Sequence, residues 1–448
     1  MRHARPSASL APTRTMPAPR ASALLASLFV AVALPAHAAG CGGDQFSAGG
    51  TAASDDAGPA DATGDDGADD TSDDSAPIYL YRHDPPDADA GADDANADGC
   101  AAPSCGIACD AGYTVCGATC TDVHTDAKNC GTCGHDCQGG ACSGGMCQPV
   151  VLGEDPGGVN LVVYGKYLYL TGNADGNVYG CPTDGCPNGP FVVASAQPNY
   201  LAGLVANSAG VYWTTADVSG GIVTGCAVGN CTDIKAPLAA YGPGQEPYVL
   251  ASDSTALYWT VMDSTGGSGG SVSKCALSGC GRTPDILAAG GSPGFIAEQS
   301  GFLYWLVRTT SDAGESTTEL VKCSSDGCGG SPTLLVSAVS AKWDRIAIDA
   351  ANVYWLDMAN GGILRCGVGG CATPTRLASS QNPTWVAVDD TSVYWTDASG
   401  VVRCTKPSCT DVTVLASGHA PGPVAVDTAS IYWFGADTSG SKIMKLAK

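Results

Sequence analysis

Cysteine is the residue type through which this chain could do chemistry, and its spacing allows two kinds. The sequence contains 23 cysteines: Cys41, ten between residues 100 and 147, and twelve between residues 181 and 409. Closely spaced thiolates bind zinc, whereas paired cysteines in an oxidising compartment form disulfides. The last twelve form six C-x-x-x-x-C pairs, which we predict to be structural disulfides: Cys181 with Cys186, Cys226 with Cys231, Cys275 with Cys280, Cys323 with Cys328, Cys366 with Cys371, and Cys404 with Cys409.

The six pairs recur at the same place in a longer repeat, which predicts the elements that hold them. An apolar residue followed by Tyr-Trp occurs at intervals of about 44 residues, with Leu170 in place of the first Trp. The seven tyrosines are Tyr169, Tyr212, Tyr258, Tyr304, Tyr354, Tyr394 and Tyr432. A period of this length is typical of one four-stranded blade of a β-propeller, so we predict seven blades within residues 149–448.

The sixth repeat shows how the strands of a blade are placed. Short apolar runs at 385–388, 393–396, 401–404 and 412–415 predict its four strands, A to D. The first cysteine of each pair ends strand C and the second leads into strand D, so each disulfide would close one hairpin. This recurrence favours structural disulfides over metal ligands. The seventh repeat has neither the hairpin nor the cysteines.

The missing strand D of the seventh repeat has a candidate at the other end of the domain. Val150-Val151-Leu152 precedes the first strand A and is as apolar as the other D strands. Pairing with residues 442–446 would close the ring and remove edges that are open to other chains. The expected fold class is all-β: a seven-bladed β-propeller closed by an N-terminal strand, preceded by a small disulfide-rich module and a disordered Asp-rich linker.

Two segments of the chain resemble known families. Tyr394-Trp395-Thr396-Asp397 spells the signature of the YWTD propellers, and residues 150–448 resemble these and the NHL-type propellers, which usually have six blades rather than seven. The cysteine spacing from Cys116 to Cys147 resembles the stigma-specific family of small extracellular modules, which also occurs in bacterial surface lipoproteins. We expect disulfides throughout residues 100–148, with their pairing left open. The alternative is zinc bound around Cys130-x2-Cys133.

The first forty residues predict export. Arginines precede an apolar run from Ala21 to Leu34, which has the size of a signal-peptide core. Ala38-Ala39-Gly40-Cys41 resembles a bacterial lipobox, which implies a signal peptide at 1–40 and lipidation of Cys41. The alternative is cleavage after Ala38, which would leave a free thiol. Gly42 favours the outer membrane or cell surface over retention at the inner membrane.

Charge is distributed unevenly and excludes one class of partner. The chain carries a net charge of −23, and residues 42–99 alone contain sixteen Asp against one Arg. Such a segment has too little apolar surface to fold, so we predict a lipid-anchored, disordered linker over 41–99. Without a cluster of Lys and Arg, nucleic acid is excluded as a partner. Contact with the membrane is expected only through the lipid.

Alternating strand directions give the propeller two faces. The A–B and C–D connections are short and uniform on one face, whereas the B–C connections on the other face vary in length. Variable loops on a rigid ring are where binding specificity usually lies. Five aromatics near the start of strand A on the variable face are candidate ligand-binding residues: Tyr200, Tyr248, Phe295, Trp343 and Trp385. The alternative is that these rings pack between blades. The acids that follow strand A are expected to hydrogen-bond their own turns: Asp253, Asp349, Asp389 and Asp427.

The sequence shows no catalytic constellation, so we expect no enzyme, cofactor or metal. A G-x-S-x-G match at 266–270 lies in a Gly/Ser-rich loop rather than at a strand-to-helix elbow, and His419 is the one histidine of the propeller region. The expected function is recognition of an extracellular protein or polysaccharide by an exported, surface-tethered propeller. Two alternatives stay open: a propeller hydrolase or lyase of the gluconolactonase-like type, and a structural lipoprotein of the cell envelope.

Overall fold

A computed structural model describes residues 108–448, except 173, 196, 198–199, 218, 228–230, 232–236, 265–268, 311–314, 340–341, 419–421 and 438–439. The predicted signal peptide, the lipidation site Cys41, the linker, Cys100 and Cys105 lie outside the described residues. Within the described part of the chain, no helix has the length and apolarity that crossing a membrane requires.

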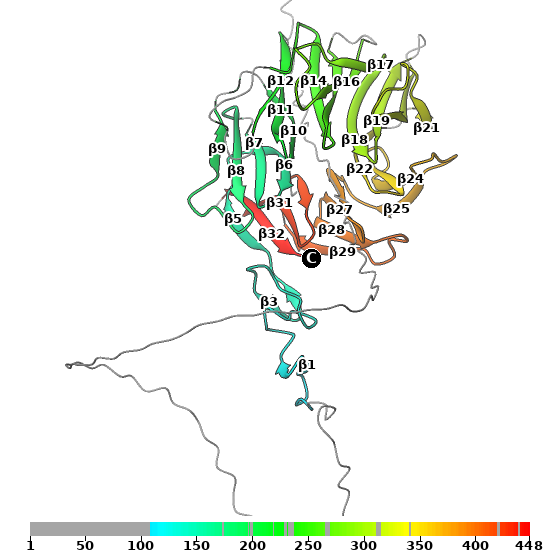
Figure 1. Ribbon diagram of the computed structural model, residues 1–448. Helices are drawn as coiled ribbons and strands as arrows, with labels where there is room; N and C mark the ends of the chain where they lie inside the picture. Colours follow the sequence, from blue (N-terminus) through cyan, green and yellow to red (C-terminus); the bar gives the residue numbers. More distant parts are fainter. Residues whose placement is uncertain are drawn as a thin grey trace, which may run out of the picture. The chain divides into compact units, whose positions relative to one another are not determined.

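Seven four-stranded antiparallel sheets form the propeller, in chain order around a ring (Figure 1). Blade 1 contains β6 (Gly158–Tyr164), β7 (Tyr167–Gly172), β8 (Asn177–Pro182) and β9 (Phe191–Ala194). Blade 2 contains β10 (Tyr200–Asn207), β11 (Gly210–Asp217), β12 (Gly220–Cys226) and β13 (Ala239–Tyr241); blade 3 contains β14 (Gln245–Ser252), β15 (Ala256–Asp263), β16 (Ser271–Ala276) and β17 (Asp285–Ala289). Blade 4 contains β18 (Ser292–Gln299), β19 (Phe302–Thr310), β20 (Ser316–Ser324) and β21 (Thr333–Val339); blade 5 contains β22 (Trp343–Ile348), β23 (Asn352–Asp357), β24 (Gly362–Gly367) and β25 (Thr375–Ser379). Blade 6 contains β26 (Trp385–Val388), β27 (Ser392–Asp397), β28 (Gly400–Thr405) and β29 (Thr413–Ser417).

Blade 7 closes the ring as predicted. Its sheet runs β30 (Val424–Val426), β31 (Ser430–Asp437), β32 (Gly440–Ala447) and then β5 (Val150–Glu154), the strand from the N-terminal end of the propeller. In Figure 1 the teal β5 lies beside the red β32. The Leu152 carbonyl accepts a 2.7 Å hydrogen bond from the amide of Cys186 in blade 1. The fold class predicted from the sequence, an all-β seven-bladed propeller, is thereby confirmed.

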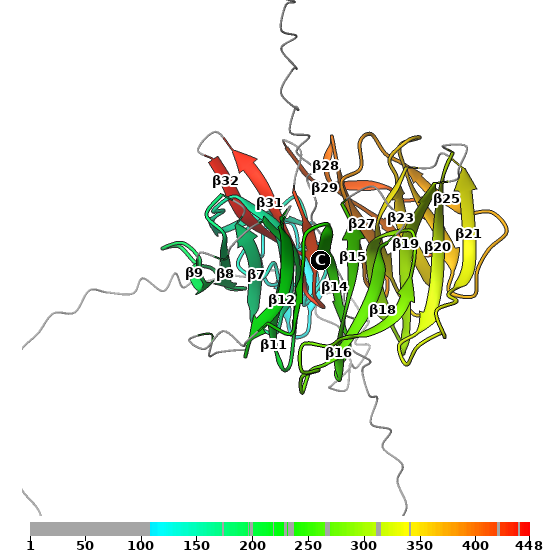
Figure 2. The same ribbon diagram turned by 90° about the horizontal axis from the view of Figure 1, so that it is seen from above.

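The repeated Tyr-Trp pairs form the core between blades. Strand B of each blade is covered by neighbours on both sides, so its apolar residues are buried on both faces of the sheet. Trp213, Trp259, Trp355 and Trp395 are fully buried. Strand A is innermost, because each strand A contacts the next around a complete circle, from β6 through β10, β14, β18, β22, β26 and β30 back to β6. Figure 2 shows the sheets from a second direction.

The two faces of the ring follow from strand direction. We call the side with the A–B and C–D connections the turn face, and the side with the B–C and D–A connections the loop face. On the turn face, each of the six predicted cysteine pairs forms a disulfide across the C–D connection: Cys181–Cys186, Cys226–Cys231, Cys275–Cys280, Cys323–Cys328, Cys366–Cys371 and Cys404–Cys409. Blade 7 has no C–D connection within one continuous segment, which explains why it lacks the pair.

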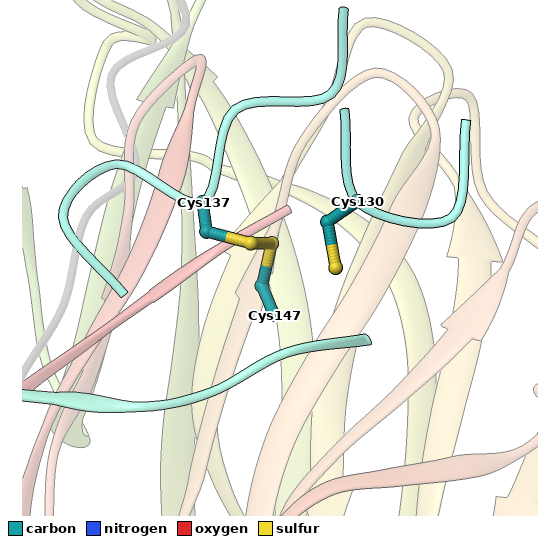
Figure 3. A group of neighbouring side chains, drawn as sticks. All are labelled: Cys130, Cys137 and Cys147. Atoms are coloured by element: carbon teal, nitrogen blue, oxygen red, sulfur yellow. A yellow bond between two sulfur atoms is a disulfide. The ribbon is translucent and has the colours of Figure 1, made fainter. Parts of the chain in front are cut away.

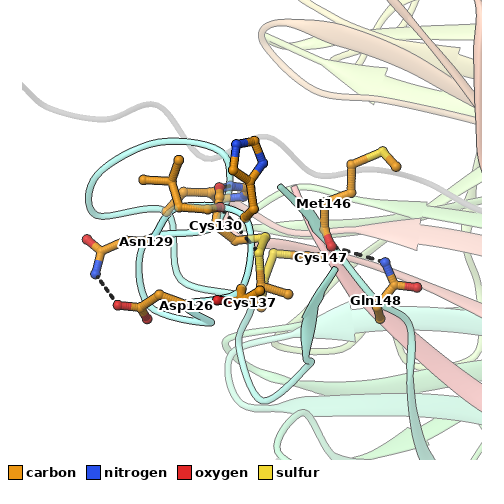
Figure 4. The surroundings of a disulfide bond; sticks show 12 residues. Asp126, Asn129, Cys130, Cys137, Met146, Cys147 and Gln148 are labelled. Atoms are coloured by element: carbon orange, nitrogen blue, oxygen red, sulfur yellow. Dashed lines mark hydrogen bonds between the residues drawn. A yellow bond between two sulfur atoms is a disulfide. The ribbon is translucent and has the colours of Figure 1, made fainter. Parts of the chain in front are cut away.

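Before the propeller, the chain forms two small hairpins joined by disulfides. One hairpin is β1 (Thr114–Cys116) with β2 (Thr119–Thr121), and the other is β3 (Cys142–Ser143) with β4 (Met146–Cys147). Four bridges hold them: Cys109–Cys120, Cys116–Cys133, Cys130–Cys142 and Cys137–Cys147. Local hydrogen bonds support the bridges, including Asn129 Nδ2 to Asp126 Oδ2 at 3.0 Å (Figure 4). Disulfides therefore replace a hydrophobic core that so short a segment cannot build.

Candidate binding site

The five aromatics predicted to bind ligand all lie in strand A, toward the loop face. Tyr200, Trp343 and Trp385 begin β10, β22 and β26, while Tyr248 and Phe295 lie inside β14 and β18. Their exposure divides them. Tyr200 is 37% exposed and Tyr248 is half-buried, whereas Phe295, Trp343 and Trp385 are at least 92% buried, with exposures of 7%, 8% and 4%. The partial ring expected from sequence is thus two accessible tyrosines beside three mostly buried rings.

β-Bulges in successive A strands aim these side chains. The register between β14 and β15 shifts between Pro247 and Leu250, and that between β18 and β19 shifts between Pro293 and Ile296. An extra residue in one strand turns its side chain away from the regular alternation. Tyr248 and Phe295 lie in these two bulges.

The equivalent bulge in blade 5 presents a residue that the sequence analysis did not identify. Arg345 lies between Asp344 and Ile346, where the register of β22 shifts, and has a φ of +42°. Its guanidinium carbon lies 4.1 Å from the ring centroid of Trp385 and 5.1 Å from that of Phe295. The residue is only 8% exposed. A cation stacked on aromatic faces is stabilised by the ring quadrupoles, so Arg345 joins the A strands of blades 4, 5 and 6. A signal was present: Arg345, like Asp344 beside it, is a charged residue inside a mostly apolar strand.

Asp344 balances the buried guanidinium. Its Oδ2 accepts a hydrogen bond from Arg345 at 3.2 Å. Burial lowers the pKa of Arg345, and the negative charge of Asp344 opposes that shift. Burial first, and then the charge of Asp344, raise the pKa of the Tyr248 hydroxyl, which therefore stays neutral and can donate a hydrogen bond. The neighbouring Phe295 ring meets Tyr248 edge-on, with centroids 5.8 Å apart. Together these contacts hold the aromatic side chains rigidly.

A hollow of about 350 Å³ opens beside this cluster, between blades 4 and 5. It is lined by Tyr248, Ser292, Gly294, Phe295, Leu306, Val307, Arg308, Thr318, Lys342, Trp343, Asp344 and Met358. Three of the five predicted aromatics, Tyr248, Phe295 and Trp343, therefore share one hollow. Tyr200 and Trp385 do not line it. We call it the blade 4–5 hollow.

Two exposed cations, Arg308 and Lys342, stand at this hollow. Neither side chain makes a hydrogen bond or ion pair with a residue that the structure describes. Three other hollows, between blades 3 and 4, 5 and 6, and 6 and 7, are lined mainly by aliphatic, glycine and serine residues, and each includes a single charged side chain. The blade 4–5 hollow differs from them in combining several aromatic walls with free positive charge.

The acids after strand A hold turns, as expected from the sequence. In each of the four, one carboxylate oxygen accepts backbone amides of the following turn, such as Asn352 N to Asp349 Oδ1 at 2.7 Å. The other oxygen accepts the hydroxyl of the repeated tyrosine at 2.7 to 2.9 Å, in the pairs Tyr258–Asp253, Tyr354–Asp349, Tyr394–Asp389 and Tyr432–Asp427. The sequence analysis missed this link, although the fixed spacing of five residues between Asp and Tyr could have indicated it.

The cysteines nearest to a metal-binding arrangement are committed to disulfides. The sulfurs of Cys130, Cys137 and Cys147 lie within 4.8 Å of one another. Figure 3 shows Cys130 next to the bridge between Cys137 and Cys147, and Cys130 is itself bonded to Cys142. A sulfur in a disulfide is not a thiolate, so these residues do not fit a zinc site. Of the remaining sequence motifs, most of 266–270 and His419 fall outside the described residues.

Comparisons with known proteins show the fold alone. No protein-family model matches the chain, and no curated protein matches it. Among solved structures, a puromycin-hydrolysing peptidase of Mycobacterium tuberculosis matches with a TM-score of 0.50 at 13% identity, over 64% of this chain and 50% of that chain. This protein thus spans half the length of that peptidase. A nidogen/laminin complex matches with a TM-score of 0.37 at 18% identity, over 54% of this chain and 87% of that chain. A chain of a mitotic checkpoint complex matches with a TM-score of 0.49 at 11% identity, over 67% of this chain and 90% of that chain.

Proposed function

We propose that this protein is an exported, surface-tethered recognition protein whose propeller binds an extracellular protein or polysaccharide at the loop face. In this proposal the propeller is related to the YWTD and NHL types, and residues 100–148 form a module of the stigma-specific kind. Lipidated Cys41 anchors the chain, and the linker, about 40 Å long as a neutral coil and longer with its charge repulsion, holds the propeller away from the membrane.

The observation that carries this proposal is the blade 4–5 hollow. Binding pockets are concave, largely apolar and lined by a few polar groups that orient the ligand. Here aromatic walls from three blades meet two exposed cations, Arg308 and Lys342. On the turn face, by contrast, the four acids that follow strand A, Asp253, Asp349, Asp389 and Asp427, are engaged in their own turns.

The path of the chain leaves the hollow accessible. Val150, the first residue of β5, pairs with Lys445 near the end of β32, which is the turn-face end of that strand. The described segment that precedes β5 therefore joins the propeller at its turn face. The hollow opens on the opposite face, among the B–C and D–A connections.

Retention on the immobilised full-length protein tests the proposed function. Extracellular polysaccharide and secreted-protein fractions are passed over the wild type, an Arg308→Gln/Lys342→Gln variant and a Lys166→Gln control. Lys166 is an exposed cation in the A–B turn of blade 1, on the opposite face. We expect the double variant, but not the control, to lose most of the retained material. If neither the wild type nor its variants retain any material, the structural alternative is favoured. Release of shortened ligand would favour a hydrolase or lyase.

Fractionation tests the anchor separately. A Cys41→Ser variant should move from the membrane fraction to the soluble fraction, because it loses the acyl chains that hold the protein at the bilayer. A mature N-terminus at Ala39 in the wild type, or unchanged membrane fractionation of the variant, would contradict lipidation while leaving ligand binding untouched.

A further inference from the structure

We propose that the blade 4–5 hollow binds a hexuronate unit of an acidic polysaccharide, with the sugar ring against its aromatic walls and the carboxylate at Arg308 and Lys342. This inference rests on the proposed function and names its ligand class. It follows from three properties of the hollow: its packed aromatic walls, two cations that pair with no described residue, and the acidity of the propeller as a whole.

The walls of the hollow suit a flat, partly apolar ring. The C–H face of a sugar packs on an aromatic face, and aromatic side chains give a large contact area at a low entropic cost. Trp343 is supported from behind by Trp355, with ring centroids 5.2 Å apart. Tyr248, the most exposed of the three lining aromatics, packs against Phe295, which is in turn covered by the stacked Arg345. Walls fixed before binding lose little freedom when a ligand arrives. A volume of about 350 Å³ lies at the small end of ligand pockets, as a site for a single unit of a polymer requires.

The charges of the hollow select an acid. Asp344 is the one anion among its described lining residues, and the Arg345 guanidinium behind it compensates that charge at 3.2 Å. Among the residues that the structure describes, Arg308 and Lys342 therefore leave net positive charge at the hollow. The Lys342 carbonyl accepts a hydrogen bond from the Met358 amide at 2.9 Å, which places its side chain beside the hollow. A carboxylate at the edge of a sugar ring would reach these cations while the ring face stays on the walls.

The surrounding protein makes this charge distinctive. Most of the net charge of the chain lies in residues 42–99, but residues 150–448 also carry 24 acidic against 15 basic side chains, so the propeller as a whole repels a polyanion. A hollow that presents two cations is therefore a preferred point of contact for an acidic polymer. An acidic peptide would also be attracted by the cations. Its carboxylates sit on flexible arms, however, and it would leave the aromatic walls uncovered, so the combination of walls and charge favours a uronate.

Binding of defined oligosaccharides to the full-length protein tests the inference. The probe is trigalacturonate, and its fully methyl-esterified form is the matched control, because the esters keep the rings and remove the charge. Triglutamate tests for an acidic peptide. By titration calorimetry we expect trigalacturonate to bind at least tenfold more tightly than the ester or the peptide. Arg308→Gln and Lys342→Gln should each weaken binding three- to tenfold, whereas Lys166→Gln should not change it. Thermal melting of each variant checks that the fold is intact.

Several results would overturn the inference. Equal affinity for the ester would mean that charge is not recognised, and equal affinity for triglutamate would mean that the ring is not recognised. An equal loss in Lys166→Gln would mean that binding follows overall charge rather than the hollow. If trigalacturonate does not bind, but retention of extracellular material still depends on Arg308 and Lys342, the uronate inference fails and the proposed function stands. If retention is also independent of these cations, both fail.

Discussion

The turn face and the loop face of the propeller are formed by the same strands, but their contacts differ. On the turn face the same contacts recur from blade to blade. On the loop face, equivalent positions of successive blades hold different residues, and the cluster around Arg345 occurs in one sector. The comparison shows how a repeat protein can vary one of its faces. Because the turn face carries repeated stabilising contacts, a local change on the loop face lowers the stability of the whole domain only slightly.

Repetition on the turn face extends to contacts between blades. In four blades, the basic residue of strand C that pairs with the repeated tyrosine reaches a carbonyl in the C–D connection of the next blade. The donors and acceptors are Lys274 with Ser325, Lys322 with Val368, Arg365 with Pro407, and Lys445 with Thr183, at 2.8, 3.3, 2.8 and 3.1 Å. The last pair crosses from blade 7 to blade 1. Disulfides, Asp–Tyr hydrogen bonds and these cations thus stabilise the ring at many equivalent points.

Divergence on the loop face begins in strand A. In each blade one residue directly precedes the residue that pairs with the second member of the Tyr-Trp dipeptide. In blades 1 to 7 this residue is Asn160, Gly203, Val249, Phe295, Arg345, Trp385 and Pro423. Side chains of such different size and charge cannot serve one shared structural purpose. Only in blades 4, 5 and 6 do they form the stack of Arg345 between two aromatic rings.

The largest loss of stability should come from removing β5, the strand that closes the ring and so supports both faces. Deletion of residues 1–153 takes away most of β5 and exposes the edge of β32, whereas deletion of 1–147 leaves β5 whole. We expect the longer deletion to cost about 5 kcal/mol or more in the free energy of unfolding, a large part of the net stability of a domain. Thermal and urea unfolding of the two truncations measure this difference. Equal melting temperatures would contradict closure by β5.

A smaller loss of stability should distinguish tryptophans of the shared core from those at the loop face. Trp395 is 1% exposed, and Trp395→Ala should lower stability by about 3–5 kcal/mol through the cavity it leaves. Trp343→Ala should cost less, because one side of its ring borders the hollow, and should also weaken ligand retention. Trp385, which is buried against Arg345, should behave like Trp395 in melting experiments. If Trp343→Ala unfolds the protein as readily as Trp395→Ala, the hollow is only a gap in the core.

The smallest effect is the loss of stability at low pH that comes from an ion pair on the turn face. Burial opposes ionisation of Asp389, but the hydrogen bond and charge of Lys448, 2.5 Å away, outweigh it and lower the pKa of the carboxyl to about 2. Because the pKa is lower in the folded state, this stabilisation is complete above the unfolded value of about 4 and is lost between about pH 4 and pH 2. The contribution is about 1–2 kcal/mol after allowance for screening. Lys448→Met should reduce the stability difference between pH 6 and pH 2 seen in urea unfolding. An unchanged difference would exclude the pair as its source.

The sequence predicted the features that recur from blade to blade. Seven Tyr-Trp dipeptides and six cysteine pairs predicted the blades, and the unmatched Val150–Leu152 predicted the closing strand, because each repeat must bury the same faces against its neighbours. The candidate site was predicted only in part. All five aromatics were placed correctly in strand A, but their exposure depends on bulges and on neighbouring blades. Arg345 was missed although it is a charged residue in a mostly apolar strand, because the repeat does not predict that its side chain lies between two aromatic rings.

The sequence by itself determined the number of blades, the way the ring closes and the partners of the propeller cysteines, because period, hydrophobic alternation and short loops are local properties. Only the tertiary structure decided which side chains meet across blades. Tyr248, Phe295 and Arg345 are far apart in the chain, yet they lie in the bulges of three A strands. In the folded protein Tyr248 packs against Phe295, and Arg345 lies between Phe295 and Trp385. A one-residue bulge changes which way a side chain points without changing the repeat. The pairing registers and the circle of A strands therefore place the hollow, which no single repeat encodes.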